Sequence, residues 1–416
     1  MSDAFLKHIL SVKNTTPQAS LSWDVLNHET NTVTSFPVKL DALLYQQTLP
    51  HATVYFNWYD DMFAKFAYYT EPTETLAELQ RKRAQDIRNR YDYVRFWFSG
   101  GSDSTTALNA FMDNNIHIDE IVLYTFPDKN VADPLLSCNR ELFLSAKPYL
   151  ELNAHRLANT KITDVSLDYN EYKRLLSGPD SLGYVPYLYS MDNGSFLYGL
   201  NSSQYVWEKM IKQTEVENYC DVYGGTKVMV YNSAGEYYMY MIDTGIPDMA
   251  LSERGEDFFL SRRDPSLFVK TAHLLKRYAK LNNLTPKQVV ELQKKTANAP
   301  KYNFAIGRDP VHNDVAMYKL DRDDGNYSQH VGRNIRGYKQ FLLVENLGKD
   351  ESWAKLFKAH GENLNIMRKD YSWIWNLNDK GEPDPGAGYK GHLSKFYSLE
   401  RPRIADNTEV IRDGIF

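Results

Sequence analysis

The chain has 416 residues, 43% of them hydrophobic and 24% charged, and carries a formal net charge of −5 at pH 7. This composition is typical of a globular protein with a sizeable core, and the length suggests two or three domains. The negative balance excludes a surface that is basic throughout and grips nucleic acid, although it leaves room for a local basic patch.

The cysteines and the apolar runs of the sequence indicate the cellular compartment in which the protein is expected. The two cysteines, Cys138 and Cys220, lie far apart and form no C-x-x-C pair, which argues against a disulfide framework and a local cysteine metal site. The N-terminal residues lack a signal-peptide pattern, and no apolar run approaches the length of about 18 residues that a membrane span needs. We therefore expect a cytoplasmic protein with no membrane partner.

Residues 1–74 are expected to form a small N-terminal module, with short strands at 32–38 and 53–58. A helix is predicted over 75–91, where Thr75 and Glu78 have the spacing of a capping box. Its basic residues are Arg81, Lys82, Arg83, Arg88 and Arg90. They are expected to form a solvated face, with contacts to ligand phosphates or RNA as the alternative.

A strand, a loop and a helix follow in immediate succession. An apolar run over 94–98 ends in Ser99-Gly100-Gly101-Ser102-Asp103-Ser104, and a helical pattern begins at Thr105. The free N–H groups and partial positive charge of a helix N-terminus attract anions, and glycines let the backbone approach them closely. The sequence therefore predicts an anion cradle. The loop has neither the lysine of a Walker motif nor the spacing of a dinucleotide-binding motif.

Two further strands are predicted at 120–126 and 162–168, and the helix after the loop should end near Asn114 and Asn115. Strand, helix and strand at this spacing form a βαβ unit, so the sheet is expected to be parallel. Parallel sheets bind ligands beyond the carboxyl ends of their strands, so the loop and the 125–129 segment should share one rim.

The rest of the chain gives weaker signals. Residues 221–231 are predicted to form a glycine turn that enters a strand, and 232–235 a hairpin turn into a strand over 237–242. Helices are expected at 203–213, at 266–280, from Thr285 with Gln288 completing its cap, and within 345–370, whereas 376–392 is loop-like.

The run from Ser99 to Ser104 resembles the Ser-Gly-Gly-x-Asp-Ser loop of the PP-loop, or N-type, ATP pyrophosphatases, a family that includes the synthetase domain of asparagine synthetase. The resemblance implies an α/β fold, namely a parallel-sheet, adenine nucleotide alpha-hydrolase-like (HUP-type) domain. We expect this domain at 75–300, between the N-terminal module and a mostly helical or irregular C-terminal extension at 301–416. The implied cofactors are ATP and Mg²⁺.

The resemblance also implies roles for particular residues. The pyrophosphate part of ATP would be held by Ser99, Gly100, Gly101, Ser102, Ser104 and Thr105. Asp103 would hold Mg²⁺ as a catalytic residue, with a carboxylate that merely complements the helix dipole as the alternative. After the second strand, the nucleotide would contact Tyr124, Thr125 and Phe126.

Basic residues beyond the loop are further candidates. Lys227, behind the glycine turn, would stabilise the leaving pyrophosphate as a catalytic residue, or would be an ordinary lysine at a strand start. Lys270 and His273 share one helix face at a spacing of i, i+3. They would complete the nucleotide site, or belong only to an amphipathic helix.

Three stretches also resemble tailed-phage proteins of the asparagine-synthetase-like type, which implies a host cytoplasm for a phage-encoded chain. They are Arg81–Asp103, Lys270–Tyr278 and His392–Tyr397. Asparagine synthesis itself is placed in doubt because the second acidic metal motif of asparagine synthetase is not recognisable. Position 2 is Ser2 rather than cysteine, so the chain is not expected to release ammonia from glutamine.

The resemblance implies an ATP-dependent ligase or amidotransferase that adenylates a substrate oxygen, releases pyrophosphate and then admits an amine or ammonia. The substrate would be a small molecule or a nucleobase. Two alternatives stay open: sulfur transfer to an adenylated RNA base, which would need Cys138 or Cys220, and a nucleotide-binding regulator without catalysis. The sequence indicates neither the acceptor nor the oligomeric state, and its charge does not indicate a nucleic-acid partner.

Overall fold

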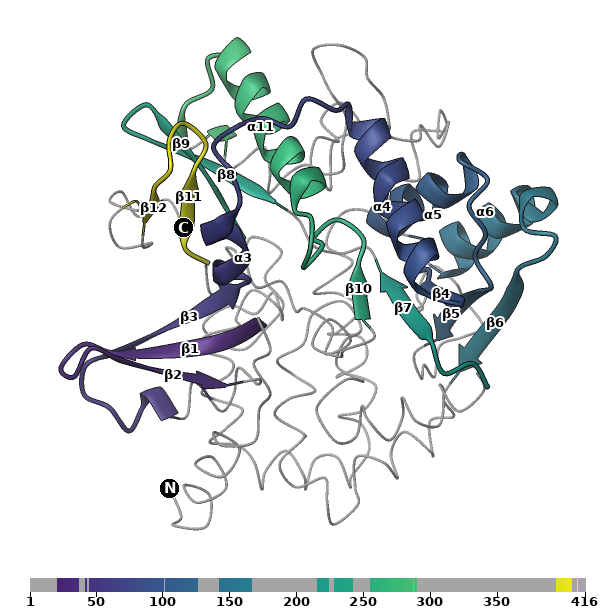
Figure 1. The fold of residues 1–416 in the computed structure, drawn as a ribbon, viewed down its shortest axis with the longest axis horizontal. Coiled ribbons are helices and arrows are strands. Elements are labelled where there is room, and N and C mark those ends of the chain that lie inside the picture. Colours follow the sequence, from purple (N-terminus) through teal and green to yellow (C-terminus); the bar gives the residue numbers. More distant parts are fainter. Residues whose placement is uncertain are drawn as a thin grey trace.

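A computed structural model describes most of the N-terminal half of the chain and parts of the remainder (Figure 1). The described residues are 21–36, 42, 45–100, 102–125, 142–166, 215–223, 228–241, 255–286, 288–289, 394–405 and 410. Their strands form three sheets, of three, five and four strands. The helices expected at 203–213 and 345–370 lie outside the described residues.

The N-terminal sheet is antiparallel, with strand order β2-β1-β3. Its strands are β1 (Leu21–Asn27), β2 (Thr32–Phe36) and β3 (Ala52–Trp58), and α3 (Asp60–Lys65) follows them. The predicted strand at 53–58 is confirmed, and so is the predicted strand at 32–38 as far as residue 36, after which residues 37 and 38 lie outside the described residues. β1 was not predicted because Ser22 and Asp24 interrupt its apolar pattern; both are buried, and Ser22 Oγ donates to Asp24 Oδ1 at 2.7 Å.

The central sheet has five parallel strands in the order β10-β7-β4-β5-β6. Its strands are β4 (Tyr93–Trp97), β5 (Glu120–Thr125), β6 (Lys161–Ser166), β7 (Tyr219–Tyr223) and β10 (Gly255–Asp257). From β4 the chain adds β5 and β6 on one side, then returns to add β7 and β10 on the other. The expected α/β fold with a parallel sheet is therefore confirmed.

Helices lie together on one side of this sheet (Figure 1). They are α4 (Leu76–Arg90), α5 (Ser102–Met112), the π-helical turn η1 (Leu142–Ala146), α6 (Lys147–Leu152) and the 3-10 turn η2 (Ala154–Arg156). Leu79 and Ile87 of α4, Phe111 of α5 and Phe96 of β4 belong to one buried core between helices and sheet. The capping box of Thr75 and Glu78 is present, as predicted.

The third sheet is antiparallel, with strand order β12-β11-β9-β8. Its strands are β8 (Met229–Ser233), β9 (Glu236–Tyr240), β11 (Phe396–Ser398) and β12 (Ile404–Ala405). The hairpin turn predicted before β9 is confirmed, since Ala234 and Gly235 both have positive φ and join the two strands. Strands β11 and β12 come from the segment expected to be helical or irregular, and β11 pairs with β9.

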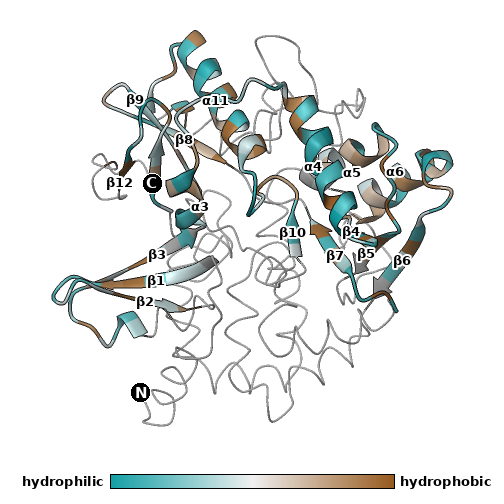
Figure 2. Ribbon diagram, in the orientation of Figure 1, coloured by the Kyte–Doolittle hydropathy of each residue, from teal (hydrophilic) through white to brown (hydrophobic). Residues whose placement is uncertain are grey.

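The long helix α11 (Ser266–Leu281) packs against both α4 and β8. In Figure 2, α4 and α11 carry hydrophobic and hydrophilic residues along their length, as expected of helices that bury one face. The cap predicted at Thr285 and Gln288 is also present, because each backbone N–H is bonded by the other residue's side chain. No helix among the described residues is both long and apolar enough to cross a membrane.

A buried ion pair joins β4, the central strand of the parallel sheet, to its neighbour β7. Arg95 on β4 donates to Asp221 on β7 through Nε (2.6 Å) and Nη2 (2.9 Å), and Trp97 Nε1 donates to the same carboxylate at 2.7 Å. All three side chains are buried. Burial alone would lower the pKa of the Arg95 guanidinium, but the Asp221 carboxylate outweighs it and raises that pKa.

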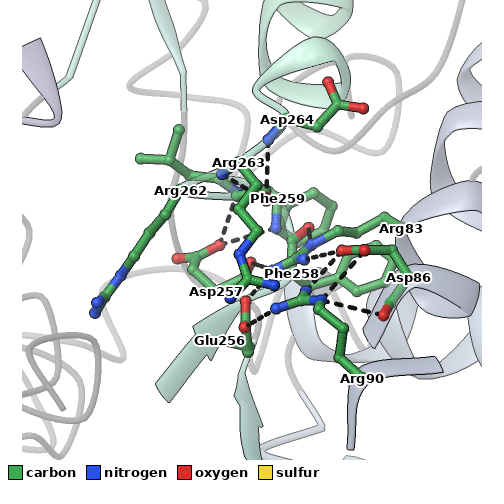
Figure 3. Close-up of polar contacts among 12 residues, drawn as sticks. Arg83, Asp86, Arg90, Glu256, Asp257, Phe258, Phe259, Arg262, Arg263 and Asp264 are labelled. Carbon is green, nitrogen blue, oxygen red and sulfur yellow. Dashed lines mark hydrogen bonds and ion pairs between the residues drawn. The ribbon is translucent and has the colours of Figure 1, made fainter. Parts of the chain in front are cut away.

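A second buried cluster attaches α4 to the edge strand β10 (Figure 3). Arg83 donates to Glu256 Oε2 and to the Asp257 carbonyl, each at 2.7 Å, and Arg90 donates to Glu256 Oε1 at 2.6 Å. Burial would raise the pKa of Glu256, but the two arginines outweigh it and lower the pKa to about 2. The expectation of a solvated basic face on this helix is therefore wrong for Arg83, which is buried.

We expect Asp221→Asn to lower the free energy of unfolding by about 3–5 kcal/mol, because it leaves the Arg95 guanidinium buried without a counter-charge. A matched control is Asp164→Asn, whose carboxylate lies 2.8 Å from Lys147 but is about half exposed. That change should cost less than about 1 kcal/mol. Urea unfolding of the three proteins measures both values, and equal losses would contradict a special role for the buried pair.

Candidate functional site

The loop after β4 lies where the connections of the parallel sheet change direction. β4 is flanked by β5, which follows it through α5, and by β7, which the chain reaches only after completing β6. In open parallel sheets, ligands bind beyond the carboxyl ends of the strands at such a switch point. The segment from Phe98 to the start of α5 emerges at this position. The strand, loop and helix predicted from the sequence are thus present, in a setting that suits a ligand.

The loop backbone requires glycine at one position. Gly100 has φ +78°, which L side chains rarely adopt. A Cβ built on Gly100 would lie 2.5 Å from the backbone nitrogen of Ala146 and 2.8 Å from its Cα. The loop therefore touches the η1 turn directly, with no space for a side chain between them.

Two hydroxyl contacts hold the loop, one between residues of the loop and its helix and one from the η1 turn. Ser99 Oγ and Ser104 Oγ lie 3.0 Å apart, so one donates to the other across the loop. Ser145 Oγ, which comes from η1, donates to the Gly100 carbonyl at 2.6 Å. Ser99 is exposed whereas Ser104 is buried, so the pair connects the loop surface to the start of α5.

Thr105 has a buried hydroxyl for which the described residues offer no partner. Its side chain is about 2% exposed, and Oγ1 has no hydrogen-bond partner among those residues. Leaving a buried hydroxyl unpaired costs about 1–3 kcal/mol, so such an atom calls for an explanation. Thr105 lies in the first turn of α5, the part of a helix whose backbone N–H groups have no intrahelical partner. A ligand oxyanion at the loop is a chemically suitable partner for this hydroxyl.

Tyr223 has the second unpartnered hydroxyl at the same edge of the sheet. It is the last residue of β7, next to the end of β4, and its buried Oη has no hydrogen bond within the part of the chain that the structure describes. Burial, reinforced by the Asp257 carboxylate, raises the pKa of Tyr223 well above its usual value, so the hydroxyl stays neutral. The sequence prediction did not include this residue. Its only signal was a tyrosine directly before the Gly224–Lys227 segment.

Several predicted site residues are described only in part. Tyr124 and Thr125 end β5 beside β4, which agrees with their predicted location at the loop's edge of the sheet, although their side chains are not described. Ser102 and Asp103 open α5, again without described side chains. The remaining candidates lie outside the described residues: Gly101, Phe126, Lys227 and Cys138.

Lys270 and His273 are engaged in other contacts. Lys270 Nζ lies 2.9 Å from Glu71 Oε1 and donates to the Pro72 carbonyl at 3.0 Å. His273 Nε2 is 3.0 Å from the Tyr68 carbonyl oxygen, and burial lowers the pKa of His273 to about 4. His273 is therefore neutral at pH 7 and offers no positive charge to a phosphate.

An open groove of about 520 Å³ runs along the same part of α11 rather than beside the loop. Its cations include Lys276, Arg277 and Lys280. Each of them is paired with a carboxylate: Arg277 with Glu71, and both lysines with Glu400. Because an incoming anion would have to displace these carboxylates, the groove is a weaker candidate site than the loop.

The described side chains leave the metal prediction for Asp103 open. Within this part of the chain, no group of three or more His, Cys, Asp or Glu side chains is arranged to hold a metal ion. Cys220 also differs from a reactive thiol: it is a residue of β7 that belongs to the buried core, and burial raises its pKa well above the usual value.

Comparisons with known proteins do not identify a family. Neither a scan against protein-family models nor a search of curated proteins found a match to this chain. The family resemblance therefore rests on the loop residues themselves.

We expect Gly100→Ala to destabilise the protein more than Gly235→Ala does. Both changes place a side chain at positive φ, and the strain costs about 1–2 kcal/mol in each case. A methyl group at position 235 would meet nothing within 4 Å, whereas at position 100 it would overlap the Ala146 backbone. Chemical unfolding measures the difference, and equal losses for the two variants would show that the loop does not pack tightly on η1.

Proposed function

We propose that this chain is an ATP pyrophosphatase of the PP-loop type with a HUP-like domain at its centre. The observation that carries the proposal is the Ser-Gly-Gly-Ser-Asp-Ser loop, Ser99–Ser104, at the carboxyl end of β4. The strand order, with β4 between β5 and β7, supports a nucleotide at this switch point. No comparison with a known protein contributes to the proposal.

The loop and the start of α5 offer hydrogen-bond donors of the kind that bind a polyphosphate. The loop offers hydroxyls from Ser99 and Ser104, the unpaired hydroxyl of Thr105, and the first backbone N–H groups of α5. Together these donors would bind the β- and γ-phosphates and orient the α-phosphate towards the acceptor. Asp103 would hold Mg²⁺, which when bound neutralises part of the phosphate charge.

The proposed reaction transfers the adenylyl group. A substrate oxygen attacks the α-phosphorus, a new P–O bond forms, and the bond to the β-phosphate oxygen breaks to release pyrophosphate. An amine or ammonia then attacks the activated carbon and AMP leaves. The loop donors and Lys227 would stabilise the negative charge of the departing pyrophosphate.

Sulfur transfer is less well supported. That reaction needs a thiolate or persulfide near the adenylate, whereas Cys220 is fully buried in the core with a raised pKa. Cys138, which lies outside the described residues, is the other candidate thiol. Unchanged activity in a Cys138→Ser, Cys220→Ser double variant would exclude this alternative.

The products of ATP turnover test the proposal. We expect the protein to bind Mg-ATP in isothermal titration and, with a panel of carboxylates and amines, to release AMP and pyrophosphate. Asp103→Ala should abolish the Mg²⁺-dependent release. Binding without AMP formation would favour a nucleotide-binding regulator, and release of ADP and phosphate or no binding at all would contradict the proposal.

Thr105→Val should change the affinity for Mg-ATP and the stability of the ligand-free protein in opposite directions. The change keeps the shape of the side chain but removes its unpaired buried hydroxyl, so the ligand-free protein should become slightly more stable. Affinity for Mg-ATP should fall about five- to tenfold, since one hydrogen bond to the polyphosphate is lost.

A neighbouring residue provides the control for this prediction. Thr106 is also buried, and it already has an interaction partner. Thr106→Val should therefore lower stability and leave Mg-ATP affinity unchanged. Thermal unfolding and isothermal titration give the two values, and a Thr105→Val protein with unaltered affinity would remove Thr105 from the proposed cradle.

A further inference from the structure

The segment that begins with η1 is bonded to the loop and its helix at two points. Ser145 Oγ donates to the Gly100 carbonyl at 2.6 Å, and the Tyr149 hydroxyl donates to Asn109 Oδ1. All three side chains are buried. Ser145 and Tyr149 are four residues apart across the junction of η1 and α6, so one face of this segment makes both bonds.

The two hydrogen bonds are made at either end of the segment that forms the candidate site. Gly100 lies in the loop and Asn109 lies in the second half of α5, so the intervening residues carry the loop and the helix N-terminus. Between the bonds, the backbone of Ala146 fits directly against Gly100. A π-helical turn such as η1 is rare and is frequently found at functional sites. The contacts therefore hold the loop and α5 in a fixed relation to η1.

We propose that Ser145 is a positioning residue that orients the peptide after Gly100 for anion binding, with Tyr149 holding α5 behind it. Because Ser145 Oγ holds the Gly100 carbonyl, it restrains rotation of the planar peptide unit to which that carbonyl belongs. The inference rests on the proposed function for the identity of the ligand, a polyphosphate.

The hydroxyl of Ser145 sets an orientation that packing alone leaves free. Gly100 lacks a side chain, so the peptide beside it can rotate at little steric cost. Ala146 limits how far the loop can move but makes no bond to the Gly100 carbonyl that would fix its direction. Removing the hydroxyl should therefore loosen the loop amides while leaving the surrounding core intact.

Hydrogen exchange in the ligand-free protein tests the positioning role without reference to any reaction. In Ser145→Ala we expect the amides of 98–105 to exchange about five- to tenfold faster, because one buried hydrogen bond is lost. Ser394→Ala is the matched control: Ser394, just before β11, is also buried, and its hydroxyl donates to the Lys395 carbonyl at 2.7 Å and accepts from the Met241 N–H at 2.9 Å. The control should leave exchange at 98–105 unchanged, and Ser145→Thr should restore slow exchange.

Binding of inorganic pyrophosphate with MgCl₂ supplies the second measurement. Ser145→Ala should raise the dissociation constant about five- to tenfold, with Tyr149→Phe giving a smaller increase and Ser394→Ala none. In an assay of AMP release, the KM for ATP should rise more than kcat falls. Loop exchange in Ser145→Ala that equals the Ser394→Ala value would overturn the positioning role.

The two proposals fail in different ways. If the wild-type protein binds neither ATP nor pyrophosphate, the proposed function fails, while the exchange measurement still decides whether Ser145 orders the loop. If the wild type binds pyrophosphate and Ser145→Ala binds it equally well, the function stands and the positioning role is wrong.

Discussion

The architecture of the candidate site depends on the buried ion pair between Arg95 and Asp221. Two charges removed from water are costly unless their geometry is excellent and their remaining hydrogen-bonding capacity is used. Here both carboxylate oxygens accept from Arg95, and Trp97 adds a third bond. The pair sits on directly opposed positions of β4 and β7. It therefore fixes which strand neighbours β4 and in which register, and so which segments meet at the carboxyl edge of the sheet.

Glu256 repeats this arrangement at the edge of the sheet, where Arg83 and Arg90 of α4 bind its carboxylate. Apolar residues of similar size pack almost interchangeably, but a buried carboxylate that loses its cation is strongly penalised. We infer that these ion pairs specify the strand order more than they add to stability. They hold β7 beside β4 and β10 against α4, although 121 residues separate the end of β4 from the start of β7.

The sequence was sufficient to predict the elements whose signals come from residues close together in the chain. The β4–α5–β5 unit and the caps at Thr75 and Thr285 follow from residues close together in the chain. Strands β7 and β10 were missed because Asp221 and Glu256 look unsuited to buried strands until Arg95 and Arg83 are seen beside them. Ser145 was missed for a similar reason, since nothing near it in the chain indicates a bond to a carbonyl 45 residues away.

Unpaired buried hydroxyls at the loop's edge of the sheet give a physical reason to look for a ligand there. Several basic side chains that sequence reasoning offered for phosphate binding already have carboxylate partners, among them Arg83, Arg90 and Lys270. By contrast, Thr105 and Tyr223 have buried hydroxyls at the carboxyl edge of the sheet that find no hydrogen-bond partner among the described residues. A protein gains stability when such groups are paired, so a ligand with oxyanions at this edge would be bound partly by the bonds that the folded chain leaves unmade.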